Sequence, residues 1–374
     1  MSFSFYVLSD THLYSETLGT RGDAYARDNQ KSQKLLAGSR SVIHDVFDRL
    51  LADGSIDTVL ISGDLVNNGE MSSHQEMLAE LTRLQTGGKK VYALTATHDY
   101  DGAHRYEGNE KIPTNGAKRT DLWEMYFPFG PDKALSVHRE SHSYTAQLAP
   151  GYRLLALNDD KDGSGHSGFS PDCLAWILEE IRKGKQDRQF LIAMTHHPMI
   201  SPSVFYSLIG KNDLMHGREA FIQAFLSAGL PFIFTGHTHM QDIARSHRFY
   251  DISTPSLVGY PGTWRVCTAD RQSNTIAVQT QQVPPEALQA MEQQFFGMIR
   301  DVVKYAAADN DRFAEMGRAF SLRPEFSRKH KHFITFCGKI LRLMRVDEIV
   351  VAVVRRLYGG NPRRDYRRTL HFKV

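Results

Sequence analysis

The sequence predicts an α/β protein of mixed α+β character, with a mixed or doubled sheet and a small helical domain at its C-terminal end. Short apolar runs alternate with segments of helical spacing, later apolar runs follow one another directly, and residues after Pro284-Pro285 again have helical spacing. With 374 residues, 41% hydrophobic and 23% charged, the chain can form a large core, and its composition excludes general disorder.

Strands and helices alternate through the first part of the chain. Six apolar runs are expected as strands: Phe3–Leu8, Thr58–Ile61, Lys90–Ala96, Tyr152–Leu157, Gln189–Met194 and Pro231–Phe234. Four segments are expected as helices: Ser41–Leu51, Ser72–Leu84, Ser170–Ile181 and Ala220–Phe225. Ser170 provides an N-cap and Pro171 suits the first helical position. This alternation predicts stretches of parallel sheet.

The next runs have no helices between them, so we expect antiparallel strands at Phe249–Ile252, Arg265–Cys267 and Asn274–Val278. The segment Tyr100–Lys118 is polar and rich in glycine. It is expected to be an inserted loop close to His98.

A domain boundary is expected near Pro284, which gives domains 1–283 and 284–374. The second has helical spacing from Leu288 to Val303, and a further helix is expected over Phe333–Leu357. From Ser321 to the end there are 14 Lys/Arg and 4 Asp/Glu, in a chain whose net charge is +3. A basic module therefore follows an acidic body. Binding of nucleic acid by this basic stretch is kept as an alternative, but a solvated or dimer-facing surface is favoured. Likewise, the helix near Lys331–Arg356 is expected to pack on the first domain, with a membrane surface as the alternative.

Composition also bears on the cellular location of the protein and on the residues that could bind a metal. No run approaches the roughly 18 apolar residues of a membrane span, and the N-terminal residues lack the basic start of a signal peptide. Three widely spaced cysteines argue against a disulfide framework or a cysteine-based zinc site. We therefore expect a cytoplasmic protein whose metal ligands, if any, come from carboxylates and the 17 histidines.

Asp or His residues follow five of the predicted strands. The strand ends that carry Asp or His read Ser9-Asp10-Thr11-His12, Ser62-Gly63-Asp64, Thr97-His98-Asp99, Thr195-His196-His197 and Gly236-His237-Thr238-His239. Sites in α/β folds form at the carboxyl ends of strands. In an extended backbone the side chains of residues i and i+2 point the same way. The two residues of the pair Asp10 and His12, and likewise those of the pair His237 and His239, are therefore expected to lie at one metal region. Imidazole and carboxylate together suit Mn, Fe or Zn.

In this order, the five strand ends resemble the pattern of the calcineurin-like metallophosphoesterases over about residues 3–280. The resemblance implies a four-layer sandwich, in which helices flank two mixed sheets, with two divalent or mixed-valence metals at the strand ends. It implies Asp10, His12 and His239 as ligands of the first metal, Asp64 as the bridge, and His196 and His237 as ligands of the second. His196 is chosen over His197 because the family's ligand lies two residues before Pro198. His98 would be the catalytic histidine.

One position departs from the family pattern. The chain has Ala96-Thr97-His98-Asp99 where the family has Gly-Asn-His-Asp. Thr97 takes the place of an asparagine metal ligand and offers only a hydroxyl on a shorter side chain. The second metal is therefore expected to be held more weakly, and a non-catalytic metal-binding scaffold is kept as an alternative.

The second strand end separates this chain from the protein phosphatases of the superfamily. Asp64 begins Asp-Leu-Val-Asn-Asn-Gly, without the Asp and Arg that follow in those enzymes. This stretch is similar to bacterial phosphodiesterases, so a small phosphodiester is the expected substrate, attacked by a hydroxide that bridges the two metals. His98 would protonate the leaving oxygen, and Asp99 would orient His98. Asn67, Tyr100 and Arg105 are candidate substrate contacts. A phosphomonoesterase and a nuclease are the alternatives among enzymes.

Overall fold

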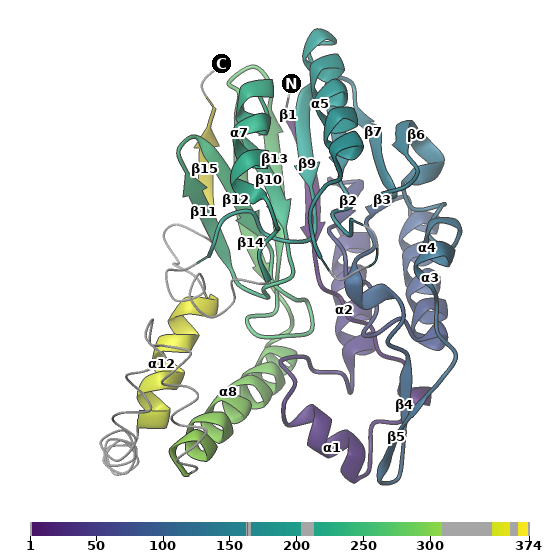
Figure 1. The fold of residues 1–374 in the computed structure, drawn as a ribbon, viewed down its shortest axis with the longest axis vertical. Helices are drawn as coiled ribbons and strands as arrows, with labels where there is room; N and C mark the ends of the chain where they lie inside the picture. Colours follow the sequence, from purple (N-terminus) through teal and green to yellow (C-terminus); the bar gives the residue numbers. More distant parts are fainter. Residues whose placement is uncertain are drawn as a thin grey trace.

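A computed structural model describes residues 2–161, 163, 166–202, 213–308, 346–359 and 366–372. Two β-sheets face each other and helices cover their outer faces, which gives the four layers that the sequence predicted (Figure 1). The N- and C-terminal ends lie near each other at one end of the sandwich (Figure 1).

The first sheet has six strands in the order β15-β14-β13-β1-β2-β3. Their bounds are β1 Ser2–Leu8, β2 Thr58–Ile61, β3 Lys90–Ala93, β13 Thr263–Asp270, β14 Thr275–Gln282 and β15 Arg367–His371. The strands β1, β2 and β3 are parallel, whereas β13, β14 and β15 pair antiparallel. The sheet is therefore mixed, as expected.

The second sheet has seven strands in the order β11-β12-β10-β9-β8-β7-β6. Their bounds are β6 Ala134–His138, β7 Ser143–Ala149, β8 Tyr152–Ala156, β9 Phe190–Met194, β10 Phe232–Thr235, β11 Asp242–Ser246 and β12 Phe249–Ser253. The expectation for β12 was only half right, because it runs parallel to β10 and antiparallel to β11. The preceding β11 contains no apolar run, so no pattern predicted this antiparallel partner of β12.

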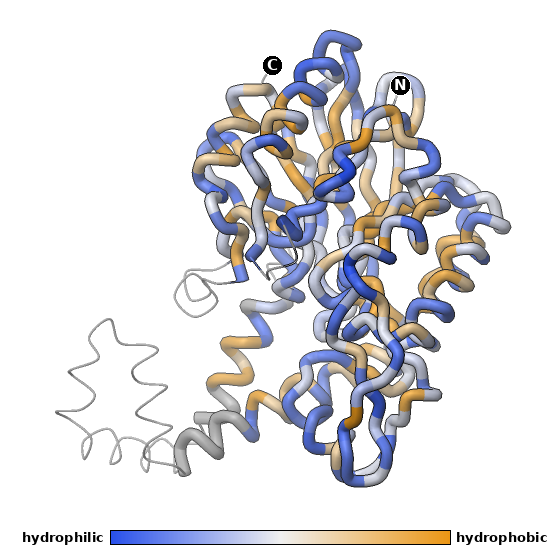
Figure 2. The backbone as a smooth tube through the Cα atoms, turned by 45° about the vertical axis from the view of Figure 1, so that its right-hand side comes forward, coloured by the Kyte–Doolittle hydropathy of each residue, from blue (hydrophilic) through white to orange (hydrophobic). Residues whose placement is uncertain are grey.

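Alternating side chains of the strands fill the layers. In β1, Phe5 and Val7 pack between the sheets, whereas Tyr6 and Leu8 face the outer helices. The outer face of the first sheet is covered by α2 (Ser39–Ala52) and α3 (Met71–Thr86), and that of the second by α5 (Pro171–Gln186) and α7 (Arg218–Ala228). Apolar stretches run along the central strands, and the outer helices alternate between apolar and polar residues (Figure 2).

The segment expected as an inserted loop is more ordered than predicted. It forms a hairpin of β4 (His104–Glu107) and β5 (Glu110–Pro113), followed by α4 (Arg119–Met125). His104 and Tyr106 are buried on one face of β4, which packs near α1 (Asp23–Asn29). Three short 3-10 helices complete the described elements: η1 Glu16–Leu18, η2 Thr97–Asp99 and η3 Pro131–Lys133.

The described helices of the C-terminal region pack against the rest of the chain and against each other. The predicted helix after Pro284 is α8 (Pro285–Ala308), whose Met291 and Phe295 are buried in the same cluster as α2 and α3. The described end of the second predicted helix is α12 (Val346–Gly359), which lies beside α8 (Figure 1). Residues 309–345, which include most of the helix expected over Phe333–Leu357 and much of the basic stretch, lie outside the described residues.

The strand β15 corrects the expectation that the end of the chain is helical, because it pairs with β14 as the edge of the first sheet. Within the described residues, every helix falls short of the length and apolar character that a membrane span requires.

Candidate metal centre

The carboxyl ends of β1, β2, β9 and β10 bring six predicted ligands together in two groups. Asp10, His12 and His239 form one group, and Asp64, His196 and His237 form the other. Within each group the ligand atoms all lie within 4.8 Å of one another. All six side chains are buried except that of His237, which is half-buried. Each group offers one carboxylate and two imidazoles, a donor set that suits Mn, Fe or Zn.

Asp64 lies between the two groups. Its Oδ2 is 3.2 Å from Nε2 of His196 in its own group and 3.7 Å from Nε2 of His12 in the other. Its Oδ1 accepts the backbone N–H of His98 at 3.1 Å. This hydrogen bond fixes the carboxylate, so the single oxygen Oδ2 faces both sets of ligand nitrogens.

Asp10 is held in a similar way. Its Oδ2 accepts hydrogen bonds from the hydroxyl of Ser9 and from the backbone N–H of His237. In the described part of the chain its Oδ1 has no hydrogen-bond partner, although it is buried, and it lies 3.3 Å from Nε2 of His239. A buried carboxylate oxygen without a donor is costly unless a cation compensates it. The residues present therefore fit a metal ion.

The histidines present lone pairs to the two groups. His196 donates from Nδ1 to the carbonyl of Ser62 at 3.0 Å, which leaves the lone pair of its Nε2 directed towards Asp64. The neighbouring His197 is bonded instead to Asp159, from its backbone N–H at 2.8 Å and through Nδ1 at 3.2 Å. The structure thus places His196, and not His197, at the centre.

Charges in the centre follow from burial and from its neighbours. Burial lowers the pKa of His12 to about 3, and the positive charge of Lys34 adds to this, so the imidazole is neutral and available to a metal. Burial also opposes a charge on His196, but the Asp64 carboxylate beside it raises its pKa to about 10. A cation between them would take the place of that proton.

The backbone of the ligands differs from the sequence-based expectation. Five of the six ligands have left-handed φ angles: Asp10 50°, His12 40°, Asp64 52°, His237 65° and His239 54°. The backbone is therefore not extended there, and His237 and His239 belong to different groups, so the expectation that this pair addresses one metal region is wrong. Such conformations cost on the order of 1–3 kcal/mol each and cluster at functional sites.

Two glycines make room for this arrangement. A Cβ on Gly236 would lie 2.3 Å from Oδ2 of Asp10 and 1.9 Å from Oγ of Ser9. A Cβ on Gly63, where φ is +112°, would lie 2.7 Å from Nδ1 of His196. At both positions the absence of a side chain permits close approach to the ligands.

His98 lies beside the first group, with its ring 5.1 Å from that of His12 between centroids. Its Nδ1 is 2.8 Å from the carbonyl oxygen of Asn67 and 3.0 Å from Oδ1 of Asn68. Because a carbonyl only accepts, Nδ1 carries the proton and Nε2 carries the lone pair. Burial and the charge of Lys34 lower the pKa of His98 to about 4.

The expectation that Asp99 orients His98 is wrong. The two oxygens of Asp99 accept the backbone N–H groups of Val66 at 2.9 Å and Ala96 at 2.8 Å, so this buried side chain fixes the loops after β2 and β3. Burial, together with the charge of Asp64, raises its pKa to about 8. Asn68 takes the orienting role, and the sequence pattern did not single it out.

The remaining predicted residues lie at different distances from the centre. Thr97 opens η2 directly before His98 and is half-buried. Asn67 belongs to the centre through its contact with His98. Tyr100 is buried in the core with its hydroxyl at Asp160. Arg105 lies on the exposed face of β4 and pairs with Glu107 at 2.9 Å, so the expected contact of Arg105 with substrate is not supported.

One further residue of the centre was missed. Lys34 lies between α1 and α2, and its Nζ donates to Oδ1 of Asn67 at 3.2 Å. Burial lowers its pKa to about 8, although Asp64 and Asp10 favour its charge. A single lysine in a polar segment carries no local pattern that could have identified it.

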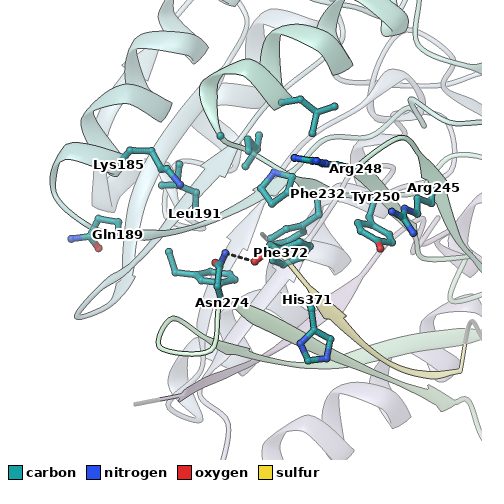
Figure 3. Close-up of a pocket in the computed structure, with 15 residues that line it drawn as sticks. Lys185, Gln189, Leu191, Phe232, Arg245, Arg248, Tyr250, Asn274, His371 and Phe372 are labelled. Atoms are coloured by element: carbon teal, nitrogen blue, oxygen red, sulfur yellow. Dashed lines mark hydrogen bonds between the residues drawn. The ribbon is translucent and has the colours of Figure 1, made fainter. Parts of the chain in front are cut away.

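Two other features lie apart from this centre. His138, Glu140 and Asp172 could form a third ligand group, but Glu140 and Asp172 are exposed to solvent. A cavity of about 410 Å³ opens at the amino ends of β9 and β10, where Lys185, Arg248 and the rings of Phe232 and Phe372 line it (Figure 3). The metal groups lie at the opposite, carboxyl ends of these strands.

The fold and the two ligand groups define a metallophosphoesterase, and the comparisons with known proteins agree. The sequence model of the calcineurin-like phosphoesterases matches residues 3–241, so the chain belongs to this family of metallophosphoesterases. The comparison with curated proteins finds no match.

Two solved structures show the same fold. A dimetal phosphatase from Danio rerio is 12% identical, with a TM-score of 0.56, and the match covers 75% of this chain and 98% of that one. A purple acid phosphatase from yellow lupin (Lupinus luteus) seeds is 15% identical, with a TM-score of 0.50, and the match covers 75% of this chain and 52% of that one.

Proposed function

We propose that this protein is a phosphodiesterase that depends on two divalent transition metals, drawn from Mn, Fe or Zn, and acts on a small phosphodiester. The observation that carries this proposal is the position of Asp64, whose Oδ2 faces His196 of one ligand group and His12 of the other. A carboxylate between two sets of imidazoles is suited to bridging two cations.

The six ligands divide the work of holding the metals. Asp10, His12 and His239 would hold the first, and His196 and His237 would hold the second, with Asp64 shared between them. Thr97 remains a candidate ligand from the neighbouring loop. When bound, two metals polarise phosphoryl oxygens and lower the pKa of a coordinated water. Because three ligands of the second group come together without an asparagine at position 97, we favour retention of both metals over a non-catalytic scaffold.

His98 would act at the leaving oxygen. Its Nδ1 is fixed by Asn67, so its Nε2 is the atom that can hold or move a proton. Burial and Lys34 disfavour a proton on Nε2 in the free protein. A phosphate anion beside the ring would favour that proton, so substrate binding itself would prepare His98 as an acid.

The preference for a diester rests on the residues around Asp64. The loop after Asp64 continues Leu-Val-Asn-Asn-Gly, lacks the Asp and Arg found in the protein phosphatases of the superfamily, and is similar to bacterial phosphodiesterases. Cys173 and Cys267 are free and buried, which supports a cytoplasmic location as part of the proposal.

The test uses metal-stripped protein titrated with Mn²⁺, with bis-p-nitrophenyl phosphate and p-nitrophenyl phosphate as substrates. We expect metal-dependent turnover that favours the diester. Asp64→Asn should lower kcat/KM on the order of 10²-fold or more, because it removes the charge that both metals share. Asp45→Asn is the control, since it makes the same chemical change at an exposed position of α2.

The other outcomes each select an alternative. Preference for the monoester would make the protein a phosphomonoesterase, and hydrolysis of DNA or RNA in place of both small substrates would make it a nuclease. Absence of both turnover and bound Mn²⁺ would contradict an enzyme and leave a scaffold. Turnover that survives both Asp64→Asn and His98→Ala would show that the centre described here is not the active site.

A further inference from the structure

Lys34 brings a positive charge into a centre whose other polar groups are suited to binding cations. Its Nζ lies 3.2 Å from Oδ1 of Asn67, the residue whose carbonyl holds His98. Its charge is close enough to depress the pKa of both His12 and His98. A lysine cannot be a metal ligand while protonated, and it repels metal ions. In the free protein the carboxylates of Asp64 and Asp10 favour its charge. Metal ions held by these carboxylates would take over their charge, and an anion beside Nζ would then compensate Lys34.

The segment from Ser256 to Gly259 forms hydrogen bonds both to the backbone around Lys34 and to Asp10 of the first metal group. Lys34 pairs with Gly259 in an antiparallel bridge, and the N–H of Leu35 donates to the carbonyl of Val258 at 2.7 Å. The same strand-like segment is fastened to Asp10, because the hydroxyl of Ser256 donates to the Asp10 carbonyl at 2.8 Å. The position of Lys34 is thereby tied to the ligand group itself.

A second support comes from α8, which lies beyond the residues that match the family. The side-chain Nε2 of Gln294 donates to the backbone carbonyl of Asn29 and, at 3.1 Å, to that of Ser32. The side-chain oxygen of Gln294 accepts a hydrogen bond from Nδ2 of Asn29 at 3.1 Å. Gln30 also donates to Asp301 at 2.8 Å. The segment that carries Lys34 is thus held between α8 on one side and the residues around Gly259 on the other.

The chemistry of Nζ points to a phosphoryl oxygen. An ammonium group has three donors, and Lys34 directs one of them to Asn67. A phosphoryl group bound at the two ligand groups would carry oxygens that the metal ions do not all neutralise. A nearby ammonium can donate to one of them, and a charge-assisted hydrogen bond of this kind is among the stronger ones in proteins.

We propose that Lys34 binds a non-bridging oxygen of the substrate's phosphoryl group and that Gln294 of α8 positions it. This inference rests on the proposed function. It assigns to the C-terminal region a part in the site that the family domain alone does not supply.

The test measures inorganic phosphate as the ligand of the Mn²⁺-loaded protein, by calorimetry and as a competitive inhibitor, together with Mn²⁺ content. We expect Lys34→Ala to weaken phosphate binding about 10-fold or more with Mn²⁺ content unchanged, and Lys34→Arg to restore much of the affinity. Lys31→Ala is the matched control, because Lys31 is exposed three residues earlier.

Two results would overturn the role of Lys34. One is unchanged phosphate affinity in Lys34→Ala. The other is higher Mn²⁺ content together with higher turnover, which would show that Nζ occupies a metal position. Calorimetry separates this inference from the proposed function, since it detects phosphate binding even if the protein hydrolyses neither nitrophenyl ester.

Gln294 is tested by its coupling to Lys34. Gln294→Ala should weaken phosphate binding in the same direction, by about 3-fold, whereas Gln293→Ala, at an exposed neighbouring position, should not. In the Lys34→Ala background Gln294→Ala should have no further effect on phosphate affinity. Loss of thermal stability with equal phosphate affinity in all backgrounds would show that Gln294 has only a structural role.

Discussion

At the residue scale, the ligands depend on backbone positions that leave no space for additional atoms. Gly236 precedes His237, whose N–H fixes Oδ2 of Asp10, and a Cβ at this glycine would collide with that same oxygen. The first group is therefore coupled to the loop that supplies His237 to the second. A single methyl group at this position should disturb both groups.

Gly236→Ala is expected to reduce Mn²⁺ binding on the order of 10-fold or more, because the new Cβ would displace the Asp10 carboxylate. Titration of metal-stripped protein with Mn²⁺ measures this. Gly54→Ala is the control, since a Cβ there meets nothing within 4 Å. Equal affinity of the two variants for Mn²⁺ would show that the loop relaxes without loss of the site.

The ligands and the residues around them differ in how far the sequence predicts them. The Asp and His residues at strand ends predicted that polar side chains gather there, because sites in α/β folds form at the carboxyl ends of strands. The resemblance to the metallophosphoesterases implied the six side chains that the structure brings together. Their binding of metal stays a prediction. Asn68 and Lys34 could not be predicted. Asn68 reads as a turn residue, and Lys34 reaches the site through contacts with residues distant in the chain, such as Asn67 and Gly259.

At the element scale, Asp251 connects three segments near the centre. It lies on β12, and its carboxylate accepts the N–H groups of Met199 at 2.7 Å and Ile200 at 3.0 Å, as well as the hydroxyl of Thr235 at the end of β10. The loop after β9, which carries His196, is thereby fixed to the neighbouring strands. Burial raises the pKa of Asp251 to about 6 from 3.8, although its three hydrogen bonds oppose this.

The raised pKa predicts a pH dependence of stability. Between pH 4 and 6 the folded state retains a proton on Asp251 that the unfolded state has lost, so this contribution is full below about pH 3.8 and disappears as pH rises through 6. Relative to Asp251→Asn, the free energy of unfolding of the wild type should fall by about 2–3 kcal/mol over this window. Urea titrations of both proteins at pH 4, 5 and 6 measure the difference. If the free energies of unfolding of the wild type and of Asp251→Asn change with pH in the same way, the raised pKa of Asp251 is contradicted.

Elements were predictable where both faces of a strand are buried. The strands β2, β9 and β10 are buried along their whole length and consist of apolar residues apart from one threonine in each of β2 and β10. The edge strands β6 and β15 have mixed exposure and were not predicted. In β15 exposed polar residues surround the buried Leu370, and pairing with β14, about 90 positions earlier in the chain, makes it part of the sheet. In β6 the apolar Leu135 is exposed, so no alternation of apolar and polar residues marks this strand.

At the scale of the whole molecule, the C-terminal region contacts the rest of the chain at two places. The helix α8 holds the segment of Lys34 through Gln294, and β15 completes the first sheet beside β14. Pro284-Pro285 and the helical spacing after it predicted where α8 begins, but this pattern could not show that the chain returns to the sheet. The boundary between 1–283 and 284–374 therefore remains a proposal about organisation, and its test is whether the two parts unfold together.

Leu370 provides that test. It lies on β15 opposite Ile276 of β14, is only 2% exposed, and packs in the core between the two sheets. If β15 unfolds together with the sandwich, Leu370→Ala should lower the free energy of unfolding of the main transition by about 2–5 kcal/mol, because it leaves a cavity in that core. Thr369→Ala, on the exposed face of the same strand, should change it by no more than about 0.5 kcal/mol. Urea unfolding followed by tryptophan fluorescence reports the sandwich directly, since Trp264 lies on β13 and Trp176 on α5. A main transition that Leu370→Ala leaves unmoved would mean that the C-terminal strand detaches before the sandwich unfolds, and that 284–374 behaves as a separate unit.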